Sequence, residues 1–576
     1  MPDIASILDD CFEELSKEFE IEKVDYVPKK GKKEIVPVPV WRIVRPAEVK
    51  GKVIPVEVFI AFPHGFPYEM PYVIIPDEEF RYLPHISFDD RKLCLYEDGI
   101  TYDANNICGI IRDNIKKARV WIEKYANRDN SDEYSAEIKS YWFQNDDSEE
   151  EVDECAALFG DVPEKTCELK GLAYSKLNLD DDSSYIQTVF YRDGNNRGIQ
   201  FLKKKHKVVE FAALFISSLA IPVKPPYSVT GEELISWVTK SDDRQALKTF
   251  INRYGKGYVL FSIGLEHALG GVFIEKLNTK RNGFRRGQLT PFIVLTRFEN
   301  KTRHLQRLLV STYNEKRIAE RTAGFMMPQR NIVIAGLGSI GSNLCYYLNG
   351  YNNAQFALID RDRLTTDNIG RHLLGYEYLN QRKTLAVAHY LQSFRPDRKV
   401  TPIAKYLQDI STNAFNEANA LFVCTGDIMS ERWLLSQMVQ GTIGLPVFIL
   451  WLEPYGVSGI MCYLNPDNKD SIDLVLARAS DNFMDYCLID RGEYINGEKL
   501  IKRDAGCNGQ YALYSANDVT FFLSAMFPYI DQLLSTPLDS KVYRWIGNVE
   551  TAIERDIQLV QDANGLTKHS IQELPL

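Results

Sequence analysis

The stretch "NIVIAGLGSIGS" at residues 331–342 runs from an apolar segment into the spacing Gly336-x-Gly338-x-x-Gly341. A short strand, a glycine turn and a following helix form the first half of a βαβ unit, and the turn can cradle a phosphate. The next apolar run, "QFALID", ends at Asp360, where a carboxylate could bind a ribose hydroxyl. Taken alone, this pattern fits NAD, FAD, S-adenosylmethionine and ATP about equally well.

The chain beyond the glycine turn continues the alternation of strands and helices. Apolar residues Ile340, Leu344 and Leu348 recur at helical spacing, and "TLAVAHYLQSF" at 384–394 predicts a second helix. The runs "ALFVCTG" at 420–426 and "PVFILWL" at 446–452 predict further buried strands. This order predicts a parallel sheet covered by helices on both faces, with a ligand at the carboxyl ends of its strands.

Charged and polar residues after the strands narrow the choice of ligand. A dinucleotide needs no converging arginine and lysine, whereas a triphosphate that must release pyrophosphate does. A carboxylate at the same edge could hold Mg²⁺ between phosphates. The residues concerned are Asp362, Asn368, Arg371 and Lys383, followed by Asp427 at the end of "CTGD". The sequence therefore predicts a site for ATP and Mg²⁺.

The combined pattern "GLGSIGS…LIDRDRLTTDNIGRH…QRK…CTGD" resembles the ThiF-type adenylation domain of ubiquitin-activating enzymes over residues 326–576. The resemblance implies that Asp360 binds the ATP ribose and that Asp427 serves the metal. Many relatives carry the acid one position earlier, where this chain has Gly426. The resemblance also implies a homodimer that supplies an arginine in trans, for which Arg317 and Arg321 are both candidates. Asn368, Arg371 and Lys383 would contact the phosphates.

A cysteine in the last part of the chain has the surroundings of a nucleophile. "KRDAGCNGQ" at 502–510 holds Cys507 beside glycines and after two basic residues, which would lower the pKa of its thiol. Such a thiolate could capture an acyl-adenylate, and thioester-forming relatives carry their cysteine in a similar loop. Cys345 and Cys424, by contrast, fall in a predicted helix and a predicted core strand and are interpreted as structural.

Residues 1–130 resemble a ubiquitin-conjugating enzyme in their order of a helix, a strand meander, the proline-rich "FPHGFP", a cysteine in "LCL", and a helix. The resemblance implies that Cys94 carries a thioester. The usual His-Pro-Asn triplet is replaced by Pro84-His85-Ile86, so the asparagine that would stabilise an oxyanion is missing. His85 could orient the loop or assist proton transfer. Cys108, on the following helix, is predicted to be buried.

The whole chain of 576 residues is too long for one core and predicts three domains in an α/β multidomain protein. The expected fold joins an α+β ubiquitin-conjugating-like domain, a mixed α/β domain and a Rossmann-like adenylation domain. A degenerate adenylation fold is one interpretation of the middle domain, and "RHLQRLLVSTYNEKRIAERT" at 303–322 predicts a long polar helix. The boundaries are 1–130 for the first domain, 131–155 for an acidic linker, 156–325 for the middle domain and 326–576 for the last.

Charge and cysteine usage exclude several other classes. A net charge of −10 disfavours a nucleic-acid partner, and no apolar run is long enough to span a membrane. The 10 cysteines include no C-x-x-C pair, so neither a zinc site nor a disulfide framework is expected. These features favour a reducing cytoplasm, with most cysteines acting as small buried apolar residues.

Both ends of the chain together suggest one reaction sequence. A partner protein's C-terminal carboxylate would form an acyl-adenylate, pass to Cys507 and then to Cys94, and finally form an amide with an amine such as a target lysine. The architecture resembles the activating–conjugating fusion proteins of bacterial CBASS antiphage operons. That resemblance implies a cGAS-like nucleotidyltransferase as the activated partner.

Two other functions remain open from the sequence. The chain could be an NAD- or FAD-dependent oxidoreductase in which Arg371 and Lys383 are incidental. It could also be a sulfur-carrier-type adenylating enzyme with a binding domain at its N-terminus, in which case Cys94 would carry no thioester.

Overall fold

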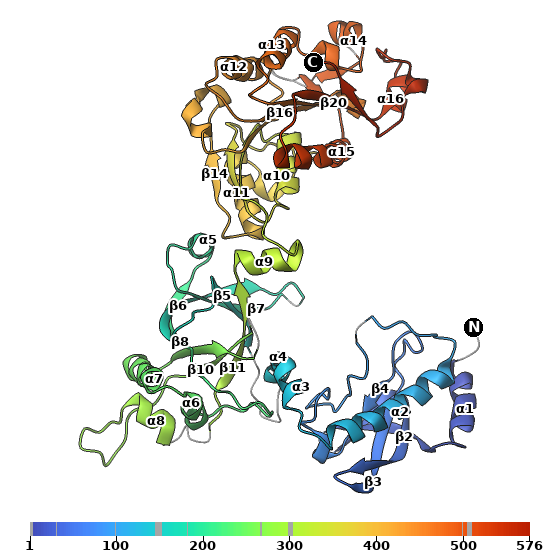
Figure 1. The fold of residues 1–576 in the computed structure, drawn as a ribbon, viewed down its shortest axis with the longest axis vertical. Helices are drawn as coiled ribbons and strands as arrows, with labels where there is room; N and C mark the ends of the chain where they lie inside the picture. The colour runs from blue at the N-terminus through green and yellow to red at the C-terminus, as the bar shows by residue number, and fades with distance from the viewer. Residues whose placement is uncertain are drawn as a thin grey trace. The chain divides into compact units, whose positions relative to one another are not determined.

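The computed structural model divides into two compact units, Met1–Asp193 with His206–Tyr313 and Gly194–Lys205 with Asn314–Leu576 (Figure 1). The first unit contains the ubiquitin-conjugating-like region and a barrel, and the second contains the glycine turn. The residues that the structure describes are 4–29, 32–97, 99–144, 153–180, 182–264, 268–297, 303–497, 499–503 and 510–576.

An antiparallel meander with helices forms the N-terminal part of the first unit, as the sequence predicts. Apolar side chains of α1 and α2 pack with Trp41, Ile43 and Val58 into one core. The alternating strand residues Val40 and Phe59 belong to a separate cluster, so the two sets of side chains are buried in different environments. The elements are α1 (Ile4–Leu15), β1 (Glu20–Lys29), β2 (Lys32–Val49), β3 (Lys52–Ala61), β4 (Tyr72–Ile74) and α2 (Ile107–Tyr125).

A disulfide joins the two helices of this region and corrects the prediction that the cysteines do not pair. Cys11 of α1 and Cys108 of α2 are bonded, with their Cα atoms 5.3 Å apart. Their separation of 97 residues leaves no local spacing that could reveal the pair. Cys108 is half-buried, not buried as predicted.

The expected acidic linker is partly a packed helical segment. Helices α3 (Ser131–Ala136) and α4 (Ile138–Phe143) occupy its first half. The indole Nε1 of Trp142 donates a hydrogen bond to the Leu308 carbonyl at 2.9 Å, and Arg307 donates to the Trp142 carbonyl at 2.7 Å. The aromatic side chains of this segment therefore bury it against the barrel. The acidic run at 145–152 lies outside the described residues.

The middle domain is a closed barrel and not an adenylation fold. Its strands pair in the order β10-β11-β5-β7-β6-β8-β9, and β9 pairs with β10 to close the ring. Side chains such as Leu158, Phe190 and Val310 pack in one apolar cluster. The strands are β5 (Asp153–Phe159), β6 (Cys167–Leu177), β7 (Ser184–Tyr191), β8 (Val209–Ile216), β9 (Gly257–Ser262), β10 (Leu269–Ile274) and β11 (Gln306–Tyr313).

Helices accompany the barrel strands, and one of the strands, β11, lies where the sequence predicts a helix. The segment 303–322 is strand β11 followed by α9 (Glu315–Thr322), and not one long helix. Helix α5, which lies between β7 and β8 in sequence, belongs to the second unit. The helices are α5 (Arg197–Lys205), α6 (Gly231–Trp237), α7 (Ser241–Tyr254) and α8 (Pro291–Arg297).

The second unit is built on an 8-stranded sheet in the order β14-β13-β12-β15-β16-β17-β20-β21. The strands from β14 to β16 run parallel, as predicted, and the remaining three add antiparallel pairs. The strands are β12 (Arg330–Ala335), β13 (Ala354–Ile359), β14 (Val400–Ile403), β15 (Ala420–Val423), β16 (Val447–Leu452), β17 (Ser458–Leu464), β20 (Lys541–Ile546) and β21 (Ile571–Leu574).

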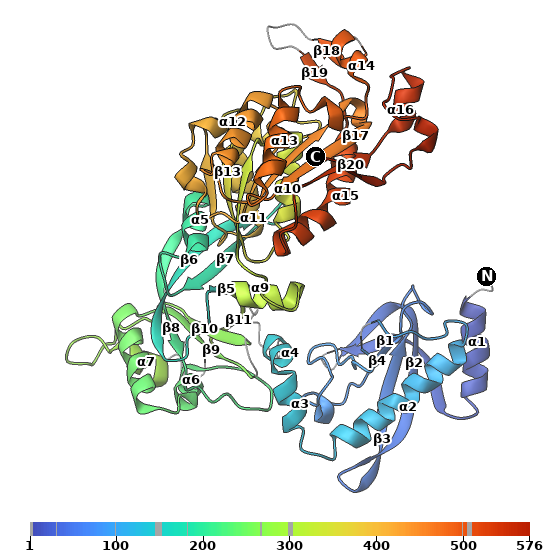
Figure 2. The ribbon, with the colours of Figure 1, turned by 45° about the horizontal axis from the view of Figure 1, so that its top comes forward.

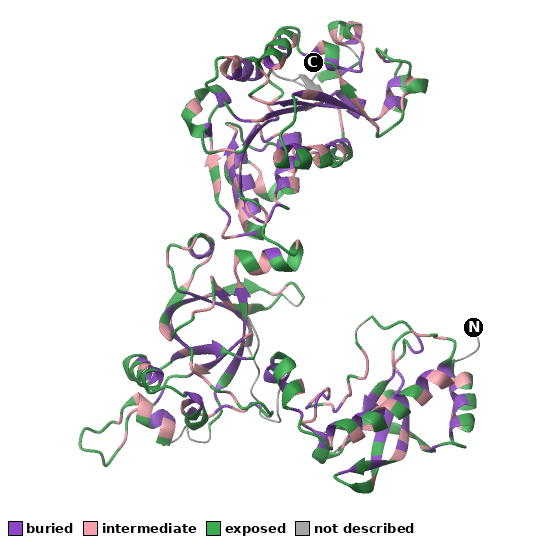
Figure 3. Ribbon diagram, viewed as in Figure 1, coloured by how far each residue is buried: buried purple, intermediate pink, exposed green. Residues whose placement is uncertain are grey.

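Alternate residues of the central strands face two separate cores. Ile332 and Ile334 of β12 pack with α10 (Ser339–Leu348), α11 (Lys383–Phe394) and α15 (Ala516–Ser535). Val333 and Ala335 pack in the other core with α12 (Ile428–Val439) and α13 (Lys469–Ala479). The sheet is accordingly buried along its length in Figure 3. This confirms the prediction of a sheet covered on both faces.

A small hairpin extends from the second unit. Strands β18 (Ile501–Arg503) and β19 (Gln510–Ala512) pair with each other, next to α14 (Arg491–Asn496) in Figure 2. A final short helix, α16 (Val549–Glu554), follows β20. Among the described residues, no helix combines the length and apolar character that crossing a membrane requires.

Candidate nucleotide and thioester sites

Two of the three glycines in the turn are fixed by close backbone approach. Gly336 has a φ of +84°, and a Cβ there would lie 2.6 Å from the carbonyl of Cys424. A Cβ at Gly341 would overlap the Gly336 carbonyl oxygen, whereas one at Gly338 would meet no atom within 4 Å. Gly338 instead lines an open cavity at the start of α10. The turn therefore has the open, amide-bearing shape that a phosphate group requires.

Asp360 fastens this turn to the neighbouring strand. It directly follows β13, and its carboxylate accepts hydrogen bonds from the Leu337 and Asp362 amides, each at 2.7 Å. The carboxylate lines a cavity of about 220 Å³ together with Gly336, Asp362 and Asp427. Asp360 is thus placed at the strand end where the sequence predicts ribose binding.

A buried histidine also holds the turn, through the carbonyl of Leu337 where Asp360 binds the amide. His372 Nε2 donates to the Leu337 carbonyl at 3.0 Å, and its Nδ1 accepts from the Leu374 amide at 3.0 Å. Burial lowers the pKa of His372 to about 4, so the ring is neutral at pH 7. The sequence motif "NIGRH" contains this residue, but its role depends on a contact with a residue 35 positions earlier, which no local pattern reveals.

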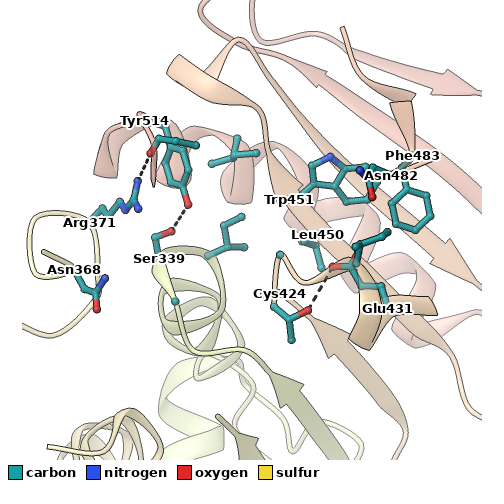
Figure 4. Close-up of a pocket in the computed structure, with 17 residues that line it drawn as sticks. Ser339, Asn368, Arg371, Cys424, Glu431, Leu450, Trp451, Asn482, Phe483 and Tyr514 are labelled. Atoms are coloured by element: carbon teal, nitrogen blue, oxygen red, sulfur yellow. Dashed lines mark hydrogen bonds between the residues drawn. The ribbon is translucent and has the colours of Figure 1, made fainter. Parts of the chain in front are cut away.

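Arg371 and Asn368 line the larger cavity, of about 550 Å³, with the start of α10 (Figure 4). An Arg371 guanidinium nitrogen donates to the Ala512 carbonyl at 2.9 Å, and Arg371 Cζ lies 4.5 Å from the centroid of the Tyr514 ring. The Tyr514 hydroxyl is hydrogen-bonded to that of Ser339 at 2.7 Å. The predicted phosphate ligand Arg371 is therefore held at the glycine turn by the end of the β18–β19 hairpin.

Lys383 lies at the first turn of α11 with its ammonium 3.5 Å from the Asp362 carboxylate. Only 9% of its side chain is exposed, and Lys383 itself lines neither cavity, so its contact with Asp362 is what relates it to the smaller one. Apart from Lys383, the structure brings the predicted residues of this unit that it describes to two cavities that share Thr425. Asn368 and Arg371 line one, and Asp360, Asp362 and Asp427 line the other.

Asp427 has a structural role, the capping of a helix, that the sequence does not indicate. It is the N-cap of α12, where its carboxylate accepts from the Met429 and Ser430 amides, each at 3.3 Å. Within the described ranges, no group of three or more His, Cys, Asp or Glu residues could hold a metal ion by itself. Mg²⁺ that bridges ATP phosphates needs one or two carboxylates, and the carboxylates of this cavity fit that requirement.

Cys507 lies outside the described residues. The strands on either side of its segment, β18 and β19, pair as a hairpin through Arg503 and Gln510. The Arg371 contact with Ala512 connects the end of this hairpin to the larger cavity. The other two cysteines considered in this unit, Cys345 and Cys424, are buried, and burial raises the pKa of both thiols.

Cys94 of the first unit is an exposed thiol held by its backbone. The Cys94 amide donates to the His85 carbonyl at 2.8 Å, and the preceding amide of Leu93 donates to Val73 at 2.8 Å. The thiol Sγ lies 3.5 Å from the Tyr96 carbonyl. An exposed sulfur on a fixed backbone has the accessibility that a thioester carrier needs.

The His85 ring contacts two carboxylates on the α3–α4 segment. Nε2 lies 3.4 Å from Glu133 and Nδ1 3.3 Å from Glu137. His85 also has a φ of +61°, and its amide donates to the Tyr141 hydroxyl at 3.2 Å. Of the two roles left open by the sequence, these contacts favour orienting the loop that carries the Cys94 backbone.

Comparison with known families finds two matches, one in each compact unit of the chain. Residues 327–449 match the ThiF family, and residues 40–150 match Prokaryotic E2 family B. The chain is thus an enzyme that carries a ThiF-type adenylation domain and an E2-like conjugating domain. It is similar to the ATP-dependent ubiquitin transferase-like protein Cap2 of Pseudomonas aeruginosa (strain BWHPSA011 / Pa011), with 29% identity over 133 residues. That match spans 22% of this chain and 23% of the relative.

Solved structures resemble parts of the chain at low identity. The crystal structure of selenomethionine PaaA is 13% identical, with a TM-score of 0.30 over 43% of this chain and 72% of that one. E. coli MccB, solved with ATP, is 14% identical, with a TM-score of 0.28 over 40% of this chain and 62% of that one. E. coli TcdA in complex with ATP is 14% identical, with a TM-score of 0.23 over 25% of this chain and 64% of that one.

Proposed function

We propose that this chain uses ATP to activate the C-terminal carboxylate of a partner protein and then transfers the acyl group through two cysteines. The observation that carries the proposal is the meeting of Arg371 and Asn368 with the glycine turn around one cavity. Lys383 adds a second, nearly buried cation, whose ammonium contacts Asp362 at the edge of the adjoining cavity. Converging cations and free amides are what a reaction that expels pyrophosphate requires.

In the first step, a carboxylate oxygen of the partner attacks the α-phosphorus of ATP, and the bond to pyrophosphate breaks. Asp360 would bind the ribose, while Arg371, Asn368 and Lys383 would contact the phosphates and stabilise the charge on the leaving group. Asp427 or Asp362 would hold Mg²⁺, which neutralises phosphate charge when bound. The products are an acyl-adenylate and pyrophosphate.

In the second step, the Cys507 thiolate attacks the acyl carbon, and AMP leaves with the electrons of the acyl–phosphate bond. The Cys94 thiolate then takes the acyl group from Cys507, which is released as a thiolate. Finally an amine, most simply a target lysine, displaces Cys94 and forms an amide. The match of residues 40–150 to an E2 family supports the role of Cys94, because that family segment contains it.

The similarity to a Cap2 protein supports a place in CBASS antiphage defence, with a cGAS-like nucleotidyltransferase as the activated partner. We further propose a homodimer in which an arginine of α9 reaches the site of the other copy. Burial and the charge of Arg321 lower the pKa of Arg317, so these two cations are close enough to interact.

ATP–pyrophosphate exchange tests this function. Exchange should require a protein or peptide with a free C-terminus and should not respond to NAD. Replacing Lys383 by Ala should reduce exchange by about 100-fold, the usual effect of removing one stabilising group from a charged transition state. Lys469→Ala changes an exposed lysine of α13 and serves as the matched control. NAD-dependent redox activity without exchange would contradict the proposal.

A further inference from the structure

The larger cavity has a second end, away from the residues that we propose to contact the phosphates. Ser339, Asn368 and Arg371 line the end next to the glycine turn, whereas Glu431, Trp451 and Asn482 lie on the other side in Figure 4. One cation, Arg371, and polar side chains thus line one part of a single cavity, and a carboxyl with an aromatic wall lines another. A ligand that fills the cavity would meet opposite charges along its length.

Glu431 is a buried carboxyl with little compensation from the protein. Only 5% of its surface is exposed, although it lies in the first turn of α12 and lines the cavity. In the part of the chain that the structure describes, its one hydrogen-bond donor is the Thr425 hydroxyl, at 3.4 Å. Burial, together with the charge of Asp427, raises the pKa of Glu431 to about 7. A carboxyl in this state lacks the donors that usually accompany burial.

The wall beside Glu431 is held in an uncommon backbone conformation. Asn482 and Phe483 have φ values of +54° and +56°, a region that non-glycine residues rarely adopt. The Phe483 ring stacks on Trp451 with centroids 5.2 Å apart and planes at 24°. Consecutive left-handed residues are strained, and strain of this kind gathers at ligand-binding sites. This observation is independent of Glu431 and concerns the same side of the cavity.

We propose that this end of the cavity is a specificity subsite for the tail of the activated protein, and that Glu431 selects tails with a lysine or arginine seated against it. This inference rests on the proposed activation of a C-terminal carboxylate. The terminal carboxylate lies at Arg371 and the glycine turn, and the upstream cation pairs with Glu431. The aliphatic stem of that cation packs on Trp451 and Phe483, as long basic side chains do on apolar surfaces.

The subsite discriminates by leaving Glu431 unpaired when the wrong tail binds. A leucine there would close off the carboxyl without giving it a donor, and a glutamate would add a second carboxyl to the same space. In both cases the loss of binding free energy is larger than for a contact on the surface, because the cavity shields the groups from water. A tail with a cation is therefore activated faster than one with an apolar or acidic residue.

Synthetic ten-residue peptides with a free C-terminus provide the test. Four sets carry Lys, Leu, Glu or Gln at one of the last five positions, and ATP–pyrophosphate exchange is measured for each. For wild-type protein, we expect one position at which Lys supports at least about 10-fold more exchange than Leu or Glu. In the Glu431→Gln variant, this preference should fall below about 3-fold. Asp470→Asn, an exposed acid of α13, is the matched control and should keep the preference.

The outcomes separate the subsite from the function on which it rests. Exchange that is equal for Lys, Leu and Glu at every position in wild-type protein overturns the subsite but leaves adenylation standing. The same preference in wild type and Glu431→Gln also overturns it. If no peptide and no protein C-terminus supports exchange, the proposed function itself fails. Because the wild-type comparison needs no variant, a Glu431→Gln protein that does not fold would not prevent the test.

Discussion

At the scale of single residues, the glycine turn is held in place by two side chains that are hydrogen-bonded to the Leu337 backbone. Its amide is bonded to the Asp360 carboxylate and its carbonyl to the neutral His372 ring. Because the ring is buried, protonation would place a charge where no solvent can compensate it. His372 therefore makes the stability of the second unit depend on pH.

We expect the His372→Gln substitution to remove an acid-sensitive contribution to stability. The pKa of His372 is about 4 when folded, compared with an ordinary value of 6.5, so the unfolded chain binds more protons between those values. The free energy of unfolding therefore falls as pH drops through this window, by about 2 kcal/mol between pH 7 and pH 5. Urea denaturation at pH 7 and pH 5 measures this change in the free energy of unfolding. The wild type should lose about 2 kcal/mol more than the variant, and equal losses would contradict this assignment.

The Gly341→Ala substitution tests the close approach inside the turn. The added methyl group would overlap the Gly336 carbonyl oxygen, so the turn must shift to accommodate it. A displacement of the phosphate-binding amides by about 1 Å is expected to reduce exchange about 100-fold, with little change in secondary structure. Gly444→Ala is the matched control, because a Cβ at that exposed position meets no atom within 4 Å. Wild-type exchange rates in Gly341→Ala protein would show that the turn does not hold the nucleotide.

At the scale of elements, the sequence predicts the adenylation sheet well because its local patterns agree with its tertiary structure. The last four residues of β12, Ile332 to Ala335, are apolar on both faces, as a strand between two helical layers requires. The segment 303–322 shows the opposite case. Its first part has helical spacing but pairs with β10 and β5 to complete the barrel. Tertiary pairing therefore overrides the local preference, and no pattern in the segment reveals its partners.

The residues of the candidate site likewise fall into those that the sequence predicts and those that it does not. The strand ends bring Asp360, Asn368 and Arg371 to the predicted edge because parallel strands place their carboxyl ends together. His372 and Glu431 were missed, because their importance depends on burial and on contacts that sequence spacing does not encode. The capping role of Asp427 depends on where α12 begins, which is among the least certain features of a sequence pattern.

The disulfide between α1 and α2 should stabilise the ubiquitin-conjugating-like region. A cross-link that closes a loop of 97 residues restricts the unfolded chain, and its loss is expected to cost about 2–4 kcal/mol. Hydrogen exchange in α1 measures the effect. The Cys11→Ser variant should exchange faster than the oxidised wild type, and reductant should make the wild type resemble the variant. Reductant should leave Cys11→Ser protein unchanged. Equal protection in all samples would contradict a stabilising disulfide.

At the scale of the whole molecule, one chain carries both an adenylating and a conjugating domain. If the proposed transfer takes place within one chain, covalent linkage raises the effective concentration of one thiol for the other. The order of the two thioesters is then the central claim. It requires that the acyl group reach Cys507 before Cys94, and that the Cys94 thioester supply the acyl group for the amide-forming step.

Thioester mapping in single-cysteine variants tests this order most directly. The protein is incubated with ATP, Mg²⁺ and a partner whose C-terminus supports exchange, and intact masses are measured with and without a thiol reductant. Cys507→Ala protein should form no thioester, whereas Cys94→Ala protein should keep one on Cys507 but yield no amide product. Cys167→Ala, which changes a cysteine outside both sites, should behave as wild type. A thioester on Cys94 in the Cys507→Ala variant, or amide formation by the Cys94→Ala variant, would contradict the account.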